Sequence, residues 1–312
     1  MAPTTKEIIK KLSELPTPNF VLKRIIDTTS NPSSNTKELE NAVLQSPPLV
    51  AKILKLSNSA YYALPRKITK LSQAINILGF KTVRNLALSI FVADSFFRRE
   101  FEFLDSQKFW KHVMSVAIAS EMLSQFVNYP DKEEIFLSGM LHDLGKIAMG
   151  IITPETVEMI LNVAEYKKVS FIKAENMLNV MTHQTFGKLL FENWNLPESV
   201  IYTAAYHDEP EKLDIDRFSL NVYIIHLANI SVNSIFYGYS GCFDIPVPSD
   251  VVWNRFDMTA KKYLDFLNNL ERKLEESNDF VKLNTFIEDT EEEKEEEKEK
   301  DEDKTEEAGE NG

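Results

Sequence analysis

Four of the five histidines in this chain, together with one aspartate, are the residues whose chemistry stands out. Neutral imidazole and carboxylate are the usual protein ligands of Zn, Fe and Mn. Ligands that are far apart in sequence converge when helices pack around a central pocket. The sequence therefore suggests a metal site, whose candidate ligands are His112, His142, Asp143, His183 and His207.

An ordinary interpretation of the same histidines stays open at this point. A single histidine on an apolar helix is more often a buried hydrogen-bonding residue or a surface residue than a metal ligand. His226 lies in an otherwise apolar segment, and we predict that it is structural. Spacing alone does not choose between a metal site and a set of ordinary buried histidines.

The elements that position these residues are predicted to be α-helices. Apolar residues recur at intervals of three and four, and the chain contains only 9 glycines. Leu71, Ala74, Ile75 and Leu78 line one face of a short helix, and Gly79 follows where a left-handed C-terminal cap is needed. We expect an all-α protein in which strands are at most a minor feature.

Local signals mark several helix boundaries. Asn35 with Glu38 has the form of a capping box, and Pro47-Pro48 ends that helix, with Pro48 as the candidate start of the next. Thr153 precedes a proline that the first turn of a helix tolerates, so it is a candidate N-cap. Because no segment rich in Gly, Ser or Pro divides the chain, we expect one body of packed helical lobes.

The formal charge of -13 comes mostly from the C-terminus. Residues 288–312 hold 15 acidic and 4 basic residues, which leaves the rest of the chain at -2. A nearly neutral body does not favour binding to a polyanion, so we predict no nucleic-acid partner. The acidic run lacks the apolar residues that would anchor it, and we expect a disordered tail at 288–312.

Cysteine usage and hydropathy bear on the compartment. The single cysteine, Cys242, cannot form an intramolecular disulfide, which fits a reducing environment. The N-terminus has no apolar segment typical of a secretion signal, and the longest apolar stretches are too short to cross a bilayer. We predict a cytoplasmic protein that does not associate with a membrane.

The segment SGMLHDLGK, which runs from Ser138 to Lys146, closely resembles the signature of the HD superfamily of metal-dependent phosphohydrolases. His112, His183 and His207 stand where the HD-GYP and HDOD branches of that superfamily place further histidines. The resemblance implies that His112, His142 and Asp143 hold one or two divalent ions, either Fe, Mn or Zn. It also implies that Asp143 could bridge a second ion and that Lys146 could approach a substrate phosphate.

Several motifs before the first histidine are similar to those of HDOD domains. They are Leu15-Pro16, Pro47-Pro48-Leu49, the segment ILKLSNSA at 53–60 and the segment AINILG at 74–79. The resemblance implies an all-helical HDOD domain at 6–215, with an N-terminal helical block at 6–97 and an HD-like part at 100–215. Residues 216–287 would then be a C-terminal helical extension packed on this domain. HDOD domains resemble bacterial signalling modules, commonly without demonstrated hydrolase activity.

The chain departs from the catalytic pattern at two places. The HD pattern ends with a metal-binding aspartate, and the corresponding residue here is Asn229, whose amide oxygen is neutral and a weaker ligand. The Gly-Tyr-Pro element of HD-GYP phosphodiesterases is missing after His207. This second departure disfavours hydrolysis of cyclic di-GMP.

Three hypotheses about function follow. The preferred one is a non-enzymatic signalling module that binds a protein partner and carries a degenerate HD-like metal pocket. The alternative is a metal-dependent phosphohydrolase that acts on a nucleotide or a related phosphoester. A third keeps the fold and treats the histidines as ordinary buried groups. The sequence identifies neither the partner nor the oligomeric state.

Overall fold

The computed structural model describes residues 4–98, 101–214 and 216–282. Within these ranges the chain is built of helices, and its one pairing of extended backbone is the isolated bridge between Phe101 and Leu104. The prediction of an all-α fold is confirmed. The acidic tail predicted at 288–312 lies outside the described residues.

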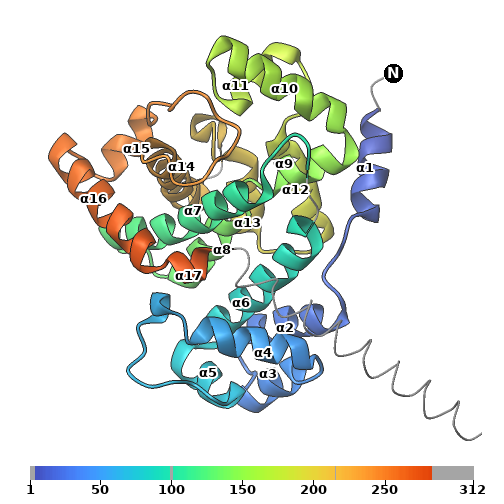
Figure 1. Cartoon of the computed structure of the whole chain (residues 1–312), viewed down its shortest axis with the longest axis vertical. Coiled ribbons are helices and arrows are strands. Elements are labelled where there is room, and N and C mark those ends of the chain that lie inside the picture. Colours follow the sequence, from blue (N-terminus) through green and yellow to red (C-terminus); the bar gives the residue numbers. More distant parts are fainter. Residues whose placement is uncertain (1–3, 99–100, 215, 283–312) are drawn as a thin grey trace, which may run out of the picture.

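The N-terminal part of the chain forms a lobe of short helices beside the main body (Figure 1). Its apolar faces meet in a shared core that contains Leu22, Leu39 and Ile53. The elements of the lobe are α2 (Phe20–Ser30), α3 (Thr36–Val43), α4 (Pro47–Ser57), η1 (Ala60–Tyr62), α5 (Leu71–Leu78), α6 (Phe80–Val92) and the π-helical turn η2 (Ala93–Phe97). The first helix, α1 (Thr5–Glu14), lies apart from the lobe (Figure 1).

The middle of the chain forms the main body (Figure 1). Its elements are α7 (Ser106–Phe126), α8 (Lys132–Leu141), α9 (Leu144–Ile152), α10 (Pro154–Lys167), α11 (Phe171–Leu178), α12 (His183–Asn193), α13 (Glu198–Tyr206), η3 (Pro210–Lys212) and η4 (Asp216–Phe218). Helices α7 and α8 pack against each other, as do α9 and α12. Helix α1 packs on α9 and α12, so the N-terminus is attached to the main body.

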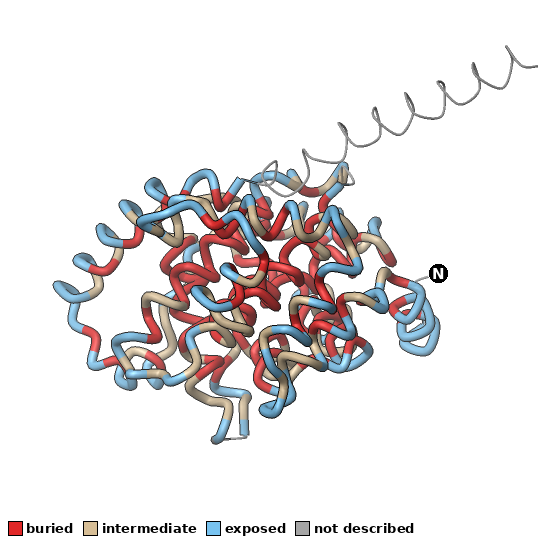
Figure 2. Tube along the Cα trace, turned by 90° about the horizontal axis from the view of Figure 1, so that it is seen from below, coloured by how far each residue is buried: buried red, intermediate tan, exposed pale blue. Residues whose placement is uncertain are grey.

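The C-terminal helices complete the core. They are α14 (Ser219–Ser234), α15 (Asp250–Arg255), α16 (Ala260–Glu276) and α17 (Asn278–Val281). Helix α14 packs along α7 and α8, whereas α16 and α17 lie against α7 from outside. Figure 2 shows the buried segments gathered at the centre of the molecule and the exposed ones at its periphery.

One described stretch, Lys132–Ile152, is long and apolar enough to cross a membrane, and 94% of its apolar window is buried inside the body. The bent pair α5–α6 would count as a second only if both helices, which meet at 117°, formed one broken span. Because this stretch, which comprises α8 and α9, is enclosed by other helices, the protein core accounts for its apolar character.

The predicted helix boundaries are largely confirmed. Asn35 and Glu38 form a complete capping box, and Gly79 ends α5 with φ 88°. Helix α4 begins at Pro47, one residue before the predicted start. Thr153 occupies the predicted N-cap of α10, before Pro154, but its buried hydroxyl does not cap the helix and donates instead to the carbonyl of Met149 in the preceding helix, at 3.0 Å.

Gly145 allows α9 and α12 to approach each other closely. A Cβ atom on Gly145 would lie 2.0 Å from the carbonyl oxygen of His183 and 2.7 Å from the backbone nitrogen of Gly187. Backbone atoms cannot turn aside as a flexible side chain can, so a larger residue must separate the two helices. Since His183 is the first residue of α12, this contact fixes the position of its imidazole.

The substitution Gly145→Ala is expected to lower the free energy of unfolding by about 2–3 kcal/mol, because the added methyl group overlaps the backbone of α12. Gly187→Ala is the matched control, since its Cβ would lie 3.4 Å from its nearest neighbour, the Cβ of Ala204. Urea unfolding measures both variants. Equal losses of stability would contradict the packing described for Gly145.

Candidate metal centre

The corner between α8 and α9 carries the central residues of the site. Helix α8 ends at Leu141 and α9 begins at Leu144, so His142 and Asp143 form the junction. One turn earlier, a Cβ on Gly139 would lie 2.8 Å from the Cα of Ala117 in α7. The absence of a side chain at this position brings α7, and with it His112, close to the corner.

The structure brings all five predicted ligands together around the Asp143 carboxylate. Its Oδ2 lies 3.4 Å from Nε2 of His142 and 3.8 Å from Nε2 of His112. Its Oδ1 lies 3.3 Å from Nε2 of His183 and 3.3 Å from Nε2 of His207. Each carboxylate oxygen therefore faces one pair of imidazoles. The first triad is His112, His142 and Asp143, the second is Asp143, His183 and His207, and the two share Asp143.

The converging atoms lack hydrogen-bond partners. Among the described residues, Nε2 of each of the four histidines and Oδ1 of Asp143 are buried without one. An unsatisfied buried polar atom costs about 1–3 kcal/mol, so five of them meeting at one point need a common ligand. Imidazole nitrogens and a carboxylate are the donor set of Zn, Fe and Mn, so the residues present could hold a divalent ion.

The centre is closed to solvent. His112 and His142 are 1% exposed, and Asp143, His183 and His207 are 0% exposed. The loop after α14 covers the site, because a Cβ on Gly238 would lie 2.5 Å from the backbone nitrogen of His112. The next residue, Tyr239, donates its backbone N–H to the carbonyl of Lys108 at 3.0 Å.

Comparison with known proteins gives the family. The family model of the HDOD domain matches residues 15–210, which is more than half of the chain. This chain belongs to the HDOD domain family. The resemblance inferred from the motifs is thereby confirmed.

Individual relatives are distant in sequence. An uncharacterized protein of Treponema pallidum is 23% identical over 212 residues, which cover 66% of this chain and 39% of that protein. This chain thus spans well under half the length of that curated relative.

Two solved structures share the fold. A candidate signal transduction protein of Marinobacter aquaeolei has a TM-score of 0.74 at 18% identity, covering 90% of this chain and 64% of that one. A candidate phosphohydrolase of Shewanella amazonensis has a TM-score of 0.69 at 20% identity, covering 88% of this chain and 97% of that one.

Sequence reasoning missed two carboxylates of this HDOD centre. Asp208 lies 3.4 Å from Nε2 of His183 and 3.7 Å from Nε2 of His207, so it faces the second triad. Glu175, which is fully buried, bonds to Nδ1 of His183 at 2.8 Å and accepts the backbone N–H of the same residue at 2.6 Å. A carboxylate behind an imidazole fixes its tautomer and orientation. Asp208 adjoins His207 in sequence, whereas nothing in the spacing indicates Glu175.

Lys146 lies inside the centre. Its ammonium donates to Oδ2 of Asp143 at 2.7 Å and to the carbonyl of Ser240 at 3.0 Å, and the residue is 3% exposed. The side chain predicted to approach a phosphate is therefore buried under the covering loop and paired with the central carboxylate.

Asn229 lies beside the first triad, and His226 lies beside His207. Asn229 lies near enough to His112 to affect its pKa, and it accepts from Nδ2 of Asn233 at 3.0 Å. His226 contacts the His207 carbonyl through Nδ1 at 2.7 Å, and its Nε2 accepts from the backbone of Ser249 at 3.2 Å. Both nitrogens of His226 are thus occupied, which agrees with its predicted structural role.

The electrostatics keep the first pair of imidazoles neutral and the carboxylate charged. Burial, followed by the neighbouring His142, lowers the pKa of His112 to about 3. Burial also lowers the pKa of His142. Burial alone would raise the pKa of Asp143, yet the Lys146 ammonium and the adjacent imidazoles hold it well below its usual value. Neutral imidazole and ionised carboxylate are the forms that bind metal.

The second triad has more acidic neighbours than the first. Burial would lower the pKa of His183, but the Glu175 carboxylate, with Asp143 and Asp208, raises it well above its usual value. Burial would raise the pKa of Asp208, but His207 and His183 lower it. Buried Glu175 behind His183 and partly buried Asp208 beside His183 and His207 thus stabilise positive charge in this half of the site, which a cation would supply.

The substitution Glu175→Gln is expected to weaken metal affinity about 10–100-fold, because His183 loses the carboxylate that orients its ring. Glu192→Gln, which alters an exposed acid on α12, the helix that carries His183, is the matched control and should leave the affinity unchanged. Competition with a chromogenic chelator measures both. Equal affinities in the two variants would show that Glu175 does not position His183.

Proposed function

We propose that this chain is a bacterial signalling module that acts in the cytoplasm by binding a protein partner, with a metal centre that serves the fold. The observation that carries the proposal is that a full set of histidine and aspartate ligands converges at a point where each is at most 1% exposed. A hydrolytic centre must admit a phosphoester and water. A centre that cross-links helices needs no such access.

In this proposal, His112, His142, His183 and His207 hold the metal together with Asp143. A bound Fe, Mn or Zn ion would supply a cross-link between helices and so contribute to folding stability. The ligands come from α7, from the α8–α9 corner and from the ends of α12 and α13. They would therefore connect segments that lie almost one hundred residues apart.

The two triads are not equivalent in charge. The second triad gains Asp208 as an additional acid, whereas the first is flanked by the neutral Asn229 and by the Lys146 ammonium. A cation next to a metal site disfavours a second positive charge. We therefore assign the tighter ion to the triad of His183, His207 and Asp143.

A signalling function also agrees with the family. The Marinobacter protein of the same fold is described as a candidate signal transduction protein. In our proposal the HDOD domain at 6–215 presents a helical surface to the partner, and residues 216–287 extend it. Because α14 packs along α7 and α8, this extension would also stabilise the body that holds the ligands.

A metal-dependent phosphohydrolase is the second candidate, and the completeness of the ligand set favours it. The Shewanella protein of this fold is described as a candidate phosphohydrolase. Two ions bridged by Asp143 would supply the activated water, and Lys146 would contact a phosphate only after leaving Asp143 and Ser240. The loop that contains Gly238 would also have to move away from His112.

Elemental analysis of protein purified without a chelator or an affinity tag tests the proposal. Stoichiometric Fe, Mn or Zn is expected in the wild type and should be lost in a His142→Ala, Asp143→Ala double variant. His226→Gln alters a buried histidine outside the ligand set and should retain the metal. Wild-type protein that contains no metal would contradict the proposed metal centre.

The same samples separate the two functions. The metal-loaded wild type is expected to hydrolyse bis(4-nitrophenyl) phosphate no faster than the double variant, because the centre is closed to a substrate. Turnover by the wild type that the double variant lacks would overturn the non-enzymatic proposal in favour of the hydrolase.

A further inference from the structure

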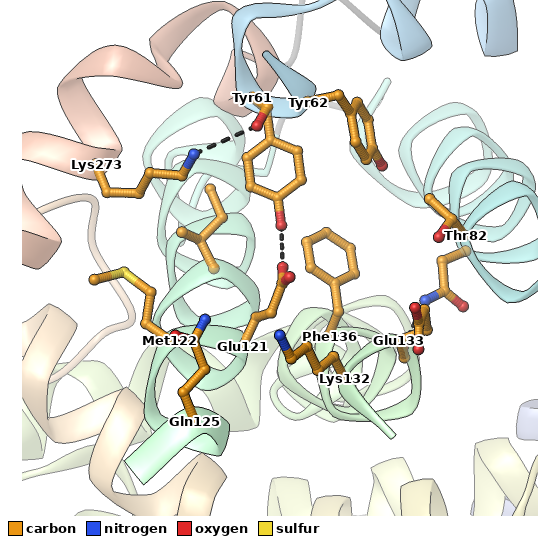
Figure 3. A pocket seen from close by; sticks show the side chains of 12 residues that line it. Tyr61, Tyr62, Thr82, Glu121, Met122, Gln125, Lys132, Glu133, Phe136 and Lys273 are labelled. Carbon is orange, nitrogen blue, oxygen red and sulfur yellow. Dashed lines mark hydrogen bonds between the residues drawn. The ribbon is translucent and has the colours of Figure 1, made fainter. Parts of the chain in front are cut away.

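A cavity of about 320 Å³ lies where the N-terminal lobe, the main body and the C-terminal helices meet. Residues of η1, α6, α7, α8 and α16 line it (Figure 3). This volume lies within the range of small-molecule sites, which form preferentially between packed units. None of the five proposed metal ligands lines the cavity, so it is a separate site.

Aromatic rings form one wall of the cavity. The rings of Tyr61 and Tyr62 meet edge to face, with centroids 4.9 Å apart and an interplanar angle of 76°. The ring of Phe136 lies 6.2 Å from that of Tyr61, and Figure 3 shows the three rings around the same space. Aromatic faces carry negative charge density, so rings grouped in this way attract cations.

Two glutamates add negative charge to this wall. Glu121 accepts a hydrogen bond from the Tyr61 hydroxyl, and Glu133 lines the cavity beside Phe136. Among the described residues, neither carboxylate forms an ion pair. Burial and the nearby Glu121 raise the pKa of Tyr61 and of Tyr62. Both phenols therefore stay neutral donors, and the two glutamates are the acidic groups of this wall.

The protein already places one ammonium group at the edge of this wall. Nζ of Lys273 lies 5.0 Å from the centroid of the Tyr61 ring and donates to the Tyr61 carbonyl at 3.3 Å. The other lysine of the lining, Lys132, is exposed at the rim. The contact made by Lys273 shows that the geometry of the wall suits an ammonium ion.

We infer that this cavity binds a small organic ammonium ion. The cation would lie against Tyr61, Tyr62 and Phe136 and would be neutralised by Glu121 and Glu133. Because Tyr61 also holds Lys273 and stacks on Phe280 of α17 with centroids 4.5 Å apart, the ligand would contact the residue that joins the N-terminal lobe to the C-terminal helices.

Isothermal titration of the full chain with choline tests the inference, with the neutral isostere 3,3-dimethylbutan-1-ol as the ligand control. Choline is expected to bind and the alcohol is not, because the two differ only in charge. Equal binding of both would overturn the assignment to a cation. The absence of choline binding at millimolar concentrations would also overturn it.

Matched variants locate the site. Glu121→Gln keeps an acceptor for the Tyr61 hydroxyl and removes the charge, so choline binding should weaken about tenfold. Lys132→Gln removes a charge of opposite sign from the same rim and should leave binding equal or tighter. If thermal melting shows that Glu121→Gln does not fold, Glu133→Gln is measured in its place. Weakening in the lysine variant but in neither glutamate variant would contradict the inference.

Discussion

The structure depends on one carboxylate facing four imidazoles. Asp143 lies at the corner between two helices, and each of its oxygens faces a different pair of histidines. Such a set of buried polar atoms is costly unless something bridges it. The rest of the body is arranged to satisfy this constraint. Gly139 brings α7 to the corner, Gly145 brings α12 to it, and α14 supports both α7 and α8.

The same buried carboxylate explains why the centre resembles a hydrolase and yet is closed. Lys146 compensates the charge of Asp143 from inside the protein and is tied to the covering loop through Ser240. That loop in turn lies on the backbone of His112 at Gly238. Each of these contacts removes access that a phosphoester would need. A set of side chains able to hold a metal ion is thus combined with nearly complete burial.

Much of the fold and the ligand set could be predicted from sequence, because both rest on local patterns. The spacing of Leu71 to Leu78, the capping box at Asn35 and the HD motif each depend on neighbouring residues. The failures involve contacts that sequence spacing does not encode. Thr153 takes the predicted N-cap position, but its hydroxyl bonds backward to Met149 and not to the helix that it begins. Glu175 reaches the site only because α11 ends beside the start of α12.

The cavity lined by Tyr61 is even harder to predict from the sequence. Lys273 and the carbonyl it contacts are 212 positions apart in sequence, and neither residue belongs to a motif. The count of charged residues predicts a nearly neutral body, and this is correct for its net charge. It could not show that Glu121 and Glu133 gather beside aromatic rings in one cavity.

X-ray absorption spectroscopy at the edge of the bound metal tests the central claim most directly, because it reports which atoms surround the ion. Our account predicts at least two imidazole ligands with oxygen in the remaining positions, since each triad combines two histidines with Asp143. A spectrum without imidazole scattering would contradict it, because the ion would then be bound somewhere other than at the meeting point of the four histidines.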